Sequence, residues 1–320
     1  VTSTMLKDVP EPDAPAIREA SPPGKGPALR TVGLSKQFGD TTALGNLDLE
    51  VPRGIVFGLL GPNGAGKTTM IRLLLDLIRP TSGNAEVLGL DCRADSLEVR
   101  SRCGYLPGDL RLPVRRTGRQ YLKHMANLRG GADEEFVSDL SGRLGLDLDQ
   151  PIGDQSKGNR QKVGLVSAFM PRPELLILDE PTSGLDPIRQ HDVQEMMRES
   201  AAAGATVLLS SHDLDQVENV AERVGIIREG SLVALEEVSS LRDRAIREVE
   251  VRFAGEVPFL GGIDGVFLVE KGDDFVRLRV TGAMDELVKT LSKSNVITLN
   301  SSRPELDEIF LSYYEDRDER

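Results

Sequence analysis

The fold of this 320-residue chain is set by the stretch Gly61-Pro62-Asn63-Gly64-Ala65-Gly66-Lys67-Thr68-Thr69. It follows an apolar run, Ile55 to Leu60, and it precedes a run with helical periodicity, Met70 to Ile78. The order strand, glycine-rich loop, helix is the setting in which a loop of this kind binds phosphate. The spacing GxxxxGK[ST] is the P-loop, or Walker A, pattern.

Each residue type in this loop has a physical task. The glycines let the backbone turn several N–H groups toward one point, which makes an anion-binding nest, and the helix that begins near Gly66 adds its positive dipole end. Lys67 can reach the β- and γ-phosphates as a point charge, and the Thr68 hydroxyl can ligate Mg²⁺. The dinucleotide pattern GxGxxG does not fit, because Thr69 stands where its third glycine would be.

Two adjacent acids identify a second element of the site. The run Leu175 to Leu178 is continuously apolar and ends in Asp179 and Glu180, which is typical of a strand buried on both faces of a parallel sheet. Ligands bind at the carboxyl ends of such strands. We expect Asp179 to hold the magnesium shell and Glu180 to act as general base for the attacking water. The alternative is two solvated acids at a strand end.

Composition limits the remaining possibilities. With 39% hydrophobic residues the chain can build a packed core, in one large domain or two ordinary ones. The net charge of −12 argues against a nucleic-acid partner. Cys92 and Cys103 lack metal-ligand spacing and fit reduced thiols of a cytosolic protein. No run approaches the ~20 apolar residues that span a bilayer, and no signal peptide is recognised, so a membrane role would need a partner chain.

The pattern along the chain predicts an α/β fold with a second, smaller unit. Residues 1–28 are proline-rich and predict a disordered leader, 29–240 hold the motifs, 241–315 alternate as half-exposed strands with amphipathic helices in a small α+β domain, and 316–320 form a charged tail. Strands are expected near 29–34, 43–51, 55–60, 85–88, 103–106, 175–180, 206–210, 224–227, 231–234, 248–253, 266–269, 275–280 and 296–299. Helices are expected near 70–78, 188–202, 214–221, 284–291 and 306–313, and over most of 110–150.

The motifs over 29–240 together resemble the ATP-binding subunits of ABC transporters. Phe38 fits the aromatic position that stacks on adenine, although an ordinary core phenylalanine would look the same. The stretch 156–161 resembles the family signature and keeps Ser156 and Gly158, which the resemblance assigns to the γ-phosphate of a partner's ATP. Ser183 to Asp186 resembles the D-loop, and His212, after a buried strand, resembles the switch histidine.

Two departures from the family pattern are visible. In the signature, Gln155, Lys157 and Asn159 replace the usual leucine, first glycine and glutamine. The Q-loop glutamine that should follow Pro107 is Gly108, and Asp109 comes next. We expect that Asp109 can serve as a weak substitute metal ligand, shifted by one residue.

The resemblance implies a P-loop NTPase ABC cassette: a RecA-like core, an antiparallel β subdomain and a helical subdomain at about 109–165. It implies ATP and Mg²⁺ as cofactors, Lys67, Glu180 and His212 as catalytic residues, and an assembly of two cassettes, identical or not. The partner would be a separate transmembrane permease, with the chain peripheral on the cytoplasmic face. The signature form, the stretch 104–108 and the C-terminal extension are most similar to the ABC-2 exporter branch, including drug- and antibiotic-resistance ATPases, rather than to importers.

Two other functions fit the motifs less well. A non-transport ABC ATPase would carry two cassettes or long coiled coils, and neither is present in the sequence. A sensor that binds ATP without turnover would not need Glu180 and His212. The basic segment 111–129, which has no acid of its own, predicts a surface toward a membrane partner or anionic headgroups, or simply a solvated helix face.

Overall fold

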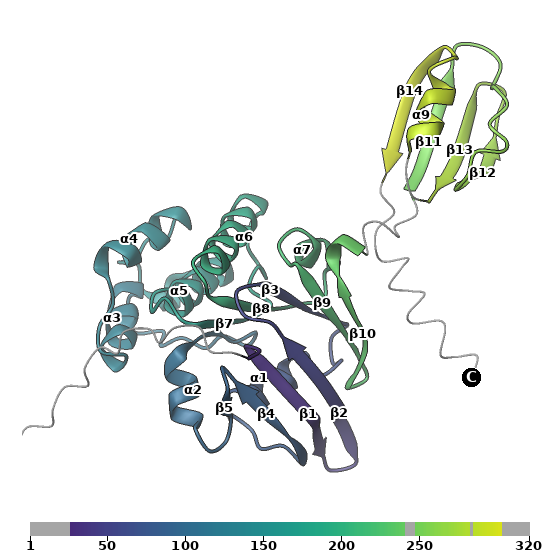
Figure 1. The fold of residues 1–320 in the computed structure, drawn as a ribbon. Coiled ribbons are helices and arrows are strands. Elements are labelled where there is room, and N and C mark those ends of the chain that lie inside the picture. Colours follow the sequence, from purple (N-terminus) through teal and green to yellow (C-terminus); the bar gives the residue numbers. More distant parts are fainter. Residues whose placement is uncertain (1–25, 241–246, 282–283, 303–320) are drawn as a thin grey trace, which may run out of the picture.

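The computed structural model describes residues 26–240, 247–281 and 284–302. Residues 26–240 form one α/β unit with two sheets, and residues 247–302 form a separate small sheet with one helix (Figure 1). None of the helices in the described residues is long and apolar enough to cross a bilayer.

The central element is a six-stranded sheet in the order β10-β9-β3-β8-β7-β6, parallel except for β10. Its strands are buried on both faces. Along β3, Phe57 and Leu59 belong to one core and Val56 and Leu60 to the other, and β7 and β8 alternate in the same way. The strands are β3 (Val56–Leu60), β6 (Cys103–Leu106), β7 (Leu175–Asp179), β8 (Thr206–Ser211), β9 (Arg223–Arg228) and β10 (Ser231–Glu237).

An antiparallel sheet in the order β2-β1-β4-β5 closes one of these cores. Its inward residues, such as Leu29, Leu47 and Val51, pack with the apolar side of α1 and with Phe57 of the central sheet. The elements are β1 (Leu29–Phe38), β2 (Thr41–Val51), β4 (Ser82–Val87), β5 (Leu90–Asp91), α1 (Lys67–Leu74) and α2 (Ser96–Arg102).

Helices cover the other face of the central sheet (Figure 1). Most of them begin at a side chain that accepts a hydrogen bond from the first helical turn, which satisfies an otherwise free N–H group. Ser156 caps α5 and Asp186 caps α6, while Thr117 and Gln120 form a capping box at α3. The helices are α3 (Gly118–Leu128), α4 (Glu134–Arg143), the 3₁₀ turn η1 (Ile152–Asp154), α5 (Lys157–Phe169), α6 (Pro187–Ala202) and α7 (Leu214–Glu218).

The small C-terminal sheet has the order β12-β13-β11-β14 and is antiparallel throughout. Every second residue of β11 and β13, for example Val251 and Leu278, packs against Leu287 and Leu291 of α9. The opposite face is charged. The elements are β11 (Arg247–Phe253), β12 (Val266–Lys271), β13 (Phe275–Val280), α9 (Asp285–Leu291) and β14 (Val296–Ser302).

Several local expectations need correction. The first helix ends at Leu74 rather than near residue 78, because Asp76 adopts a left-handed φ of 53° that a helix cannot continue through. Residues 107–117 are not helical. The strand at 266–269 does not alternate: Phe267, Leu268 and Val269 are all exposed, because β12 lies at the sheet edge and a bulge interrupts its register.

Other expectations stay as predictions. The leader over 1–25, the helix near 306–313 and the charged tail lie outside the described residues. The domain boundaries at 28, 240 and 315 also remain a prediction, although the described sheets are compatible with them.

Candidate active site

The glycine-rich loop curls over the start of α1. Lys67 is the first residue of that helix, and its Nζ donates hydrogen bonds to the carbonyl oxygens of Gly61 and Pro62, the latter at 3.1 Å. Gly66 has φ 110°, and a Cβ there would lie 2.7 Å from the Ala43 carbonyl oxygen, so both the conformation and the close approach require glycine. Residues 63–69 line a cavity of about 150 Å³ together with Asp179 and Glu180.

The cavity contains a buried cation. The Lys67 side chain is 6% exposed, and its Nζ lies 4.0 Å from Glu180 Oε1. Burial lowers the pKa of the Lys67 ammonium, and the nearby carboxylates of Glu180 and Asp179 oppose that change. A buried ammonium next to exposed backbone N–H groups at a helix start is an anion-binding arrangement.

Asp179 joins the loop to the end of the central sheet. It is 1% exposed, and its Oδ2 accepts a hydrogen bond from the Thr68 hydroxyl at 2.8 Å. Its Oδ1 accepts from the Ser210 hydroxyl at the end of β8. A hydroxyl and a single carboxylate suit Mg²⁺, which usually keeps several waters and is completed by substrate phosphates. The described residues contain no cluster of three or more His, Cys, Asp or Glu that would suggest a dedicated metal cage.

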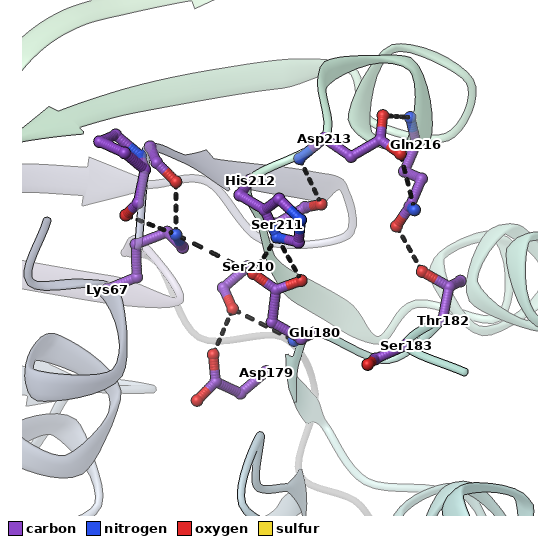
Figure 2. Close-up of polar contacts among 12 residues, drawn as sticks. Lys67, Asp179, Glu180, Thr182, Ser183, Ser210, Ser211, His212, Asp213 and Gln216 are labelled. Atoms are coloured by element: carbon purple, nitrogen blue, oxygen red, sulfur yellow. Dashed lines mark hydrogen bonds and ion pairs between the residues drawn. The ribbon is translucent and has the colours of Figure 1, made fainter. Parts of the chain in front are cut away.

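Glu180 is the first residue after β7, and its carboxylate points toward Lys67 and His212 (Figure 2). His212 Nδ1 lies 2.9 Å from both carboxylate oxygens, a spacing that a protonated Nδ1 can bridge. The backbone of Glu180 is left-handed, with φ 53°. Its N–H donates to the Ser210 carbonyl and hydroxyl oxygens at 3.2 and 3.3 Å, so the peptide is tied to β8.

A second network holds the histidine loop to the segment after Glu180 (Figure 2). The Asp213 N–H donates to Ser211 Oγ, and the Asp213 carboxylate accepts from the Gln216 side chain. The Thr182 hydroxyl donates to Gln216 Oε1. Sequence reasoning missed Thr182, Ser210 and Gln216, because a turn threonine, a strand serine and a helix glutamine carry no individual signal until the topology brings them together.

The signature-like segment lies elsewhere. Ser156 caps α5 by accepting from Asn159 N–H, and a Cβ at Gly158 would lie 2.6 Å from the Gly184 carbonyl oxygen, so this helix start rests directly on the D-loop-like segment. Lys157 Nζ lies 3.3 Å from Ser183 Oγ. The residues lining the P-loop cavity do not include Ser156, Gly158 or Asp186. One chain therefore carries two separate surfaces with the predicted nucleotide contacts.

Two predicted residues are not brought into the cluster. Phe38 ends β1 with 51% of its surface exposed and stacks under Lys36, whose Nζ is 4.8 Å from the ring centre. The carboxylate of Asp109 is directed to Arg111, at 2.8 Å, and is 67% exposed. Gly108 lies against Asp179 instead: a Cβ there would be 3.1 Å from Asp179 Oδ2. The geometry does not support Asp109 as a metal ligand.

Acids from outside the basic segment 111–129 neutralise part of it. Arg111 pairs with Asp109, and Arg119 makes two hydrogen bonds to Asp149 at 2.7 and 2.9 Å. Arg129 turns inward and donates to the Cys103 carbonyl. The exposed positive charge of this surface is therefore smaller than the sequence indicates, and Arg115 and Arg116 are its exposed centre.

Comparison with known proteins agrees with this geometry. Residues 44–183 match the family model described as ABC transporter. The chain is 36% identical over 228 residues to the bacitracin transport ATP-binding protein BcrA of Enterococcus faecalis, covering 70% of this chain and 74% of the relative. It is 34% identical over 306 residues to the daunorubicin resistance ATP-binding protein DrrA2 of Streptomyces coeruleorubidus, covering 89% and 94%. The chain belongs to the ABC transporter ATP-binding proteins.

Solved structures of this family have the same fold. One described as the ATP binding subunit of an ABC transporter superposes with TM-score 0.63 at 31% identity, covering 67% of this chain and 92% of the other. The dimeric ATP-binding cassette MJ0796 bound to ADP and Pi superposes with TM-score 0.61 at 20% identity, covering 66% and 98%, which shows the fold alone.

The family assignment settles the general function. As an ABC transporter ATP-binding protein, the chain binds and hydrolyses ATP and works with a membrane subunit. The solved cassette MJ0796 is described as dimeric. The resemblance to drug- and antibiotic-resistance ATP-binding proteins, and the P-loop ABC cassette expected from the motifs, are thereby confirmed.

Proposed function

We propose that this chain is the motor of an exporter of organic, antibiotic-like molecules, acting on the cytoplasmic face of the membrane as a homodimer with a separate permease. The observation that carries the proposal is the pair of unlike surfaces on one chain. The P-loop cavity gathers Lys67, Asp179 and Glu180, and the signature surface gathers Ser156 and Gly158 on α5. Because one chain has both surfaces, two copies can complete two sites.

In this mechanism the residues act on ATP as substrate. The P-loop N–H groups and Lys67 bind the phosphates, and Lys67 exchanges its carbonyl partners Gly61 and Pro62 for phosphate oxygens. Thr68 and Asp179 would hold Mg²⁺, which neutralises phosphate charge when bound. Glu180 orients the attacking water and accepts its proton. His212, held by that carboxylate through Nδ1, would offer its other ring nitrogen to the γ-phosphate.

Closure of the dimer follows from the same charges. Ser156, Gly158 and the N–H groups at the start of α5 would bind the γ-phosphate held by the partner's P-loop. Phe38 would stack on adenine, and Asp186 would lie at the interface next to the signature of its own chain. Loss of the γ-phosphate removes the contact shared by the two chains and lets them separate.

The export assignment rests on the relatives. Two proteins named for bacitracin transport and daunorubicin resistance match this chain, the second over 94% of its own length. The chain supplies the ATPase in this proposal, and the permease selects the molecule that is carried.

The test measures MgATP hydrolysis and oligomeric state of the purified chain. We expect Glu180→Gln to lower kcat by about 10²–10⁴-fold, the usual contribution of a general base, while ATP stays bound and the dimer becomes stable enough to isolate. Lys67→Ala should lose ATP binding. Glu195→Gln, a matched control on α6 whose carboxylate pairs with Arg198 and lies away from the P-loop cavity lining, should hydrolyse normally. Normal turnover by Glu180→Gln would exclude Glu180 as the base.

A further inference from the structure

The backbone of Glu180 has an unfavourable left-handed conformation that neighbouring groups must stabilise. A non-glycine residue with φ 53° lies in the left-handed region, which is unfavourable for L-residues with a long side chain and is kept by surrounding contacts. Such strain at a site of chemistry points to a conformation required for aiming a side chain. The groups that fix this peptide therefore also fix the direction of the carboxylate.

Hydrogen bonds hold the peptide from two sides. On the strand side, the Glu180 N–H donates to Ser210. On the helix side, the Gln161 side chain donates through Nε2 to the carbonyl oxygens of Glu180 and Pro181, both at 3.1 Å. Gln161 is 5% exposed. Two carbonyls that share one buried amide cannot change orientation without losing a hydrogen bond that water cannot replace.

Gln161 connects the Glu180 peptide to the helix that carries the signature residues. It lies on α5, one turn beyond the signature residues Ser156 and Gly158. The middle of α5 is packed in the core through Val163, Leu165 and Val166, and the backbone hydrogen bonds of the helix connect its first turn rigidly to Gln161. A shift of α5 that follows contact at its first turn is thus transmitted by Gln161 to the Glu180 peptide.

We propose that Gln161 is a positioning residue that fixes the orientation of the Glu180 carboxylate. Through α5, it links that orientation to the signature surface of the same chain, which binds the γ-phosphate in the partner's P-loop. The proposal rests on the proposed roles of Glu180 as base and of α5 as the partner's γ-phosphate site. Gln161 itself touches no reacting atom. A displaced general base leaves hydrogen-bond reach of its water, so the rate falls while ATP binding persists.

The test is a set of variants of the full-length chain. Gln161→Met keeps the length and packing of the side chain and removes both N–H donors. We expect kcat for MgATP to fall about tenfold, with the ATP dissociation constant within about twofold of wild type and a longer-lived ATP-bound dimer. Gln190→Met is the matched control, because Gln190 Nε2 donates in the same way to a loop carbonyl, that of Leu185, at 3.1 Å. It should keep the wild-type kcat.

Several outcomes would overturn the proposal. An unchanged kcat in Gln161→Met, or an equal loss in Gln190→Met, removes the positioning role, as does a parallel loss of ATP affinity. If Gln161→Met fails to fold, Gln161→Asn keeps the amide on a shorter stem, and its kcat must also fall with affinity retained. If Glu180→Gln turns over normally, the proposed base is wrong; if it is slow while Gln161→Met is normal, only the present inference is wrong.

The coupling to the other half-site has its own measurement. Ser156→Ala removes the signature hydroxyl, and the double variant with Gln161→Met completes a cycle. If the two residues act on Glu180 through α5, the loss in the double variant should be at least threefold smaller than the product of the single losses. Losses that multiply within the experimental error would refute the coupling.

Discussion

The region 26–240 and the C-terminal sheet of 247–302 differ in where their polar side chains lie. All ten buried polar side chains among the described residues lie between Thr31 and Ser211, and several of them, including Lys67, Asp179 and Ser210, surround the P-loop. The C-terminal sheet buries only apolar side chains in its described part, such as Val251 and Leu278. Its ion pairs lie on the open face, where Arg277 bridges Glu250 and Glu270.

The difference follows from sheet architecture. A parallel sheet is covered on both faces, so polar residues at its strand ends are enclosed and must find partners. An antiparallel sheet can leave one face to water, so its charges need no structural partner and contribute little to stability. Buried polar networks therefore mark the region that carries chemistry, and the C-terminal sheet is expected to contribute packing alone.

The largest effect on stability should come from the C-terminal core. Leu278→Ala should destabilise the 247–302 sheet by about 2–5 kcal/mol, since Leu278 is 1% exposed and its removal leaves a cavity. We expect MgATP hydrolysis to stay within about twofold of wild type. Thermal unfolding and ATPase assays measure both, with Arg279→Ala on the open face of the same strand as control. A large loss of hydrolysis in Leu278→Ala, with normal hydrolysis in Arg279→Ala, would show that the C-terminal sheet contributes to ATP turnover and not to packing alone.

An effect that is smaller for each thiol and each pH unit should separate burial from function inside the cassette. Burial raises the pKa of both Cys92 and Cys103 to about 12 from the ordinary 9.0. Between pH 9 and 12 the unfolded chain loses these protons first and the folded chain keeps them, so stability falls as pH rises, by about 1.4 kcal/mol per pH unit per thiol. The measurement is urea unfolding of the cassette between pH 9 and 11.

The control for this pH dependence is the variant Cys92→Ala with Cys103→Ala. Its stability should fall less steeply above pH 9 than that of the wild type, because the two buried thiols no longer titrate. Its ATPase activity should remain, since neither thiol lies in the cavity lining. Equal slopes in the two proteins would show that the thiols do not ionise differently on unfolding.

The smallest effect should come from Asp109. Its carboxylate is exposed and held by Arg111, whereas Asp179 is enclosed and bonded to Thr68. Asp109→Ala should hydrolyse MgATP at the wild-type rate within about twofold, and Asp179→Ala should lose activity. A tenfold loss in Asp109→Ala would show that its carboxylate reaches the nucleotide after all, as the sequence position indicated.

Sequence reasoning reached the parts of the site that local pattern determines. The predicted site elements do lie at one edge of the central sheet, because the carboxyl ends of parallel strands meet there. They are the P-loop, the acids Asp179 and Glu180 after β7, and His212 after β8. The catalytic and binding roles of these residues remain predictions.

What the sequence could not supply is long-range contact. Gln161 and Glu180 are 19 positions apart, and Thr182 and Gln216 are 34 apart; nothing local indicates that either pair meets. Asp109 is a different case, because its partner Arg111 is only two residues away: the local guanidinium binds the carboxylate that was predicted to serve as a metal ligand. The exposure of Phe267, Leu268 and Val269 in β12 was not predicted either, because it depends on an edge position and on a bulge that the local sequence does not indicate.

The left-handed backbone of Glu180 also has an evolutionary consequence. At φ 53° the fold alone would favour glycine or asparagine at position 180, while hydrolysis requires a carboxylate. Selection for thermal stability without selection for turnover would therefore favour glycine or asparagine at this position. The resulting protein would be more stable and would not hydrolyse ATP. We therefore expect selection for ATP turnover, and not selection for stability, to keep a glutamate at position 180.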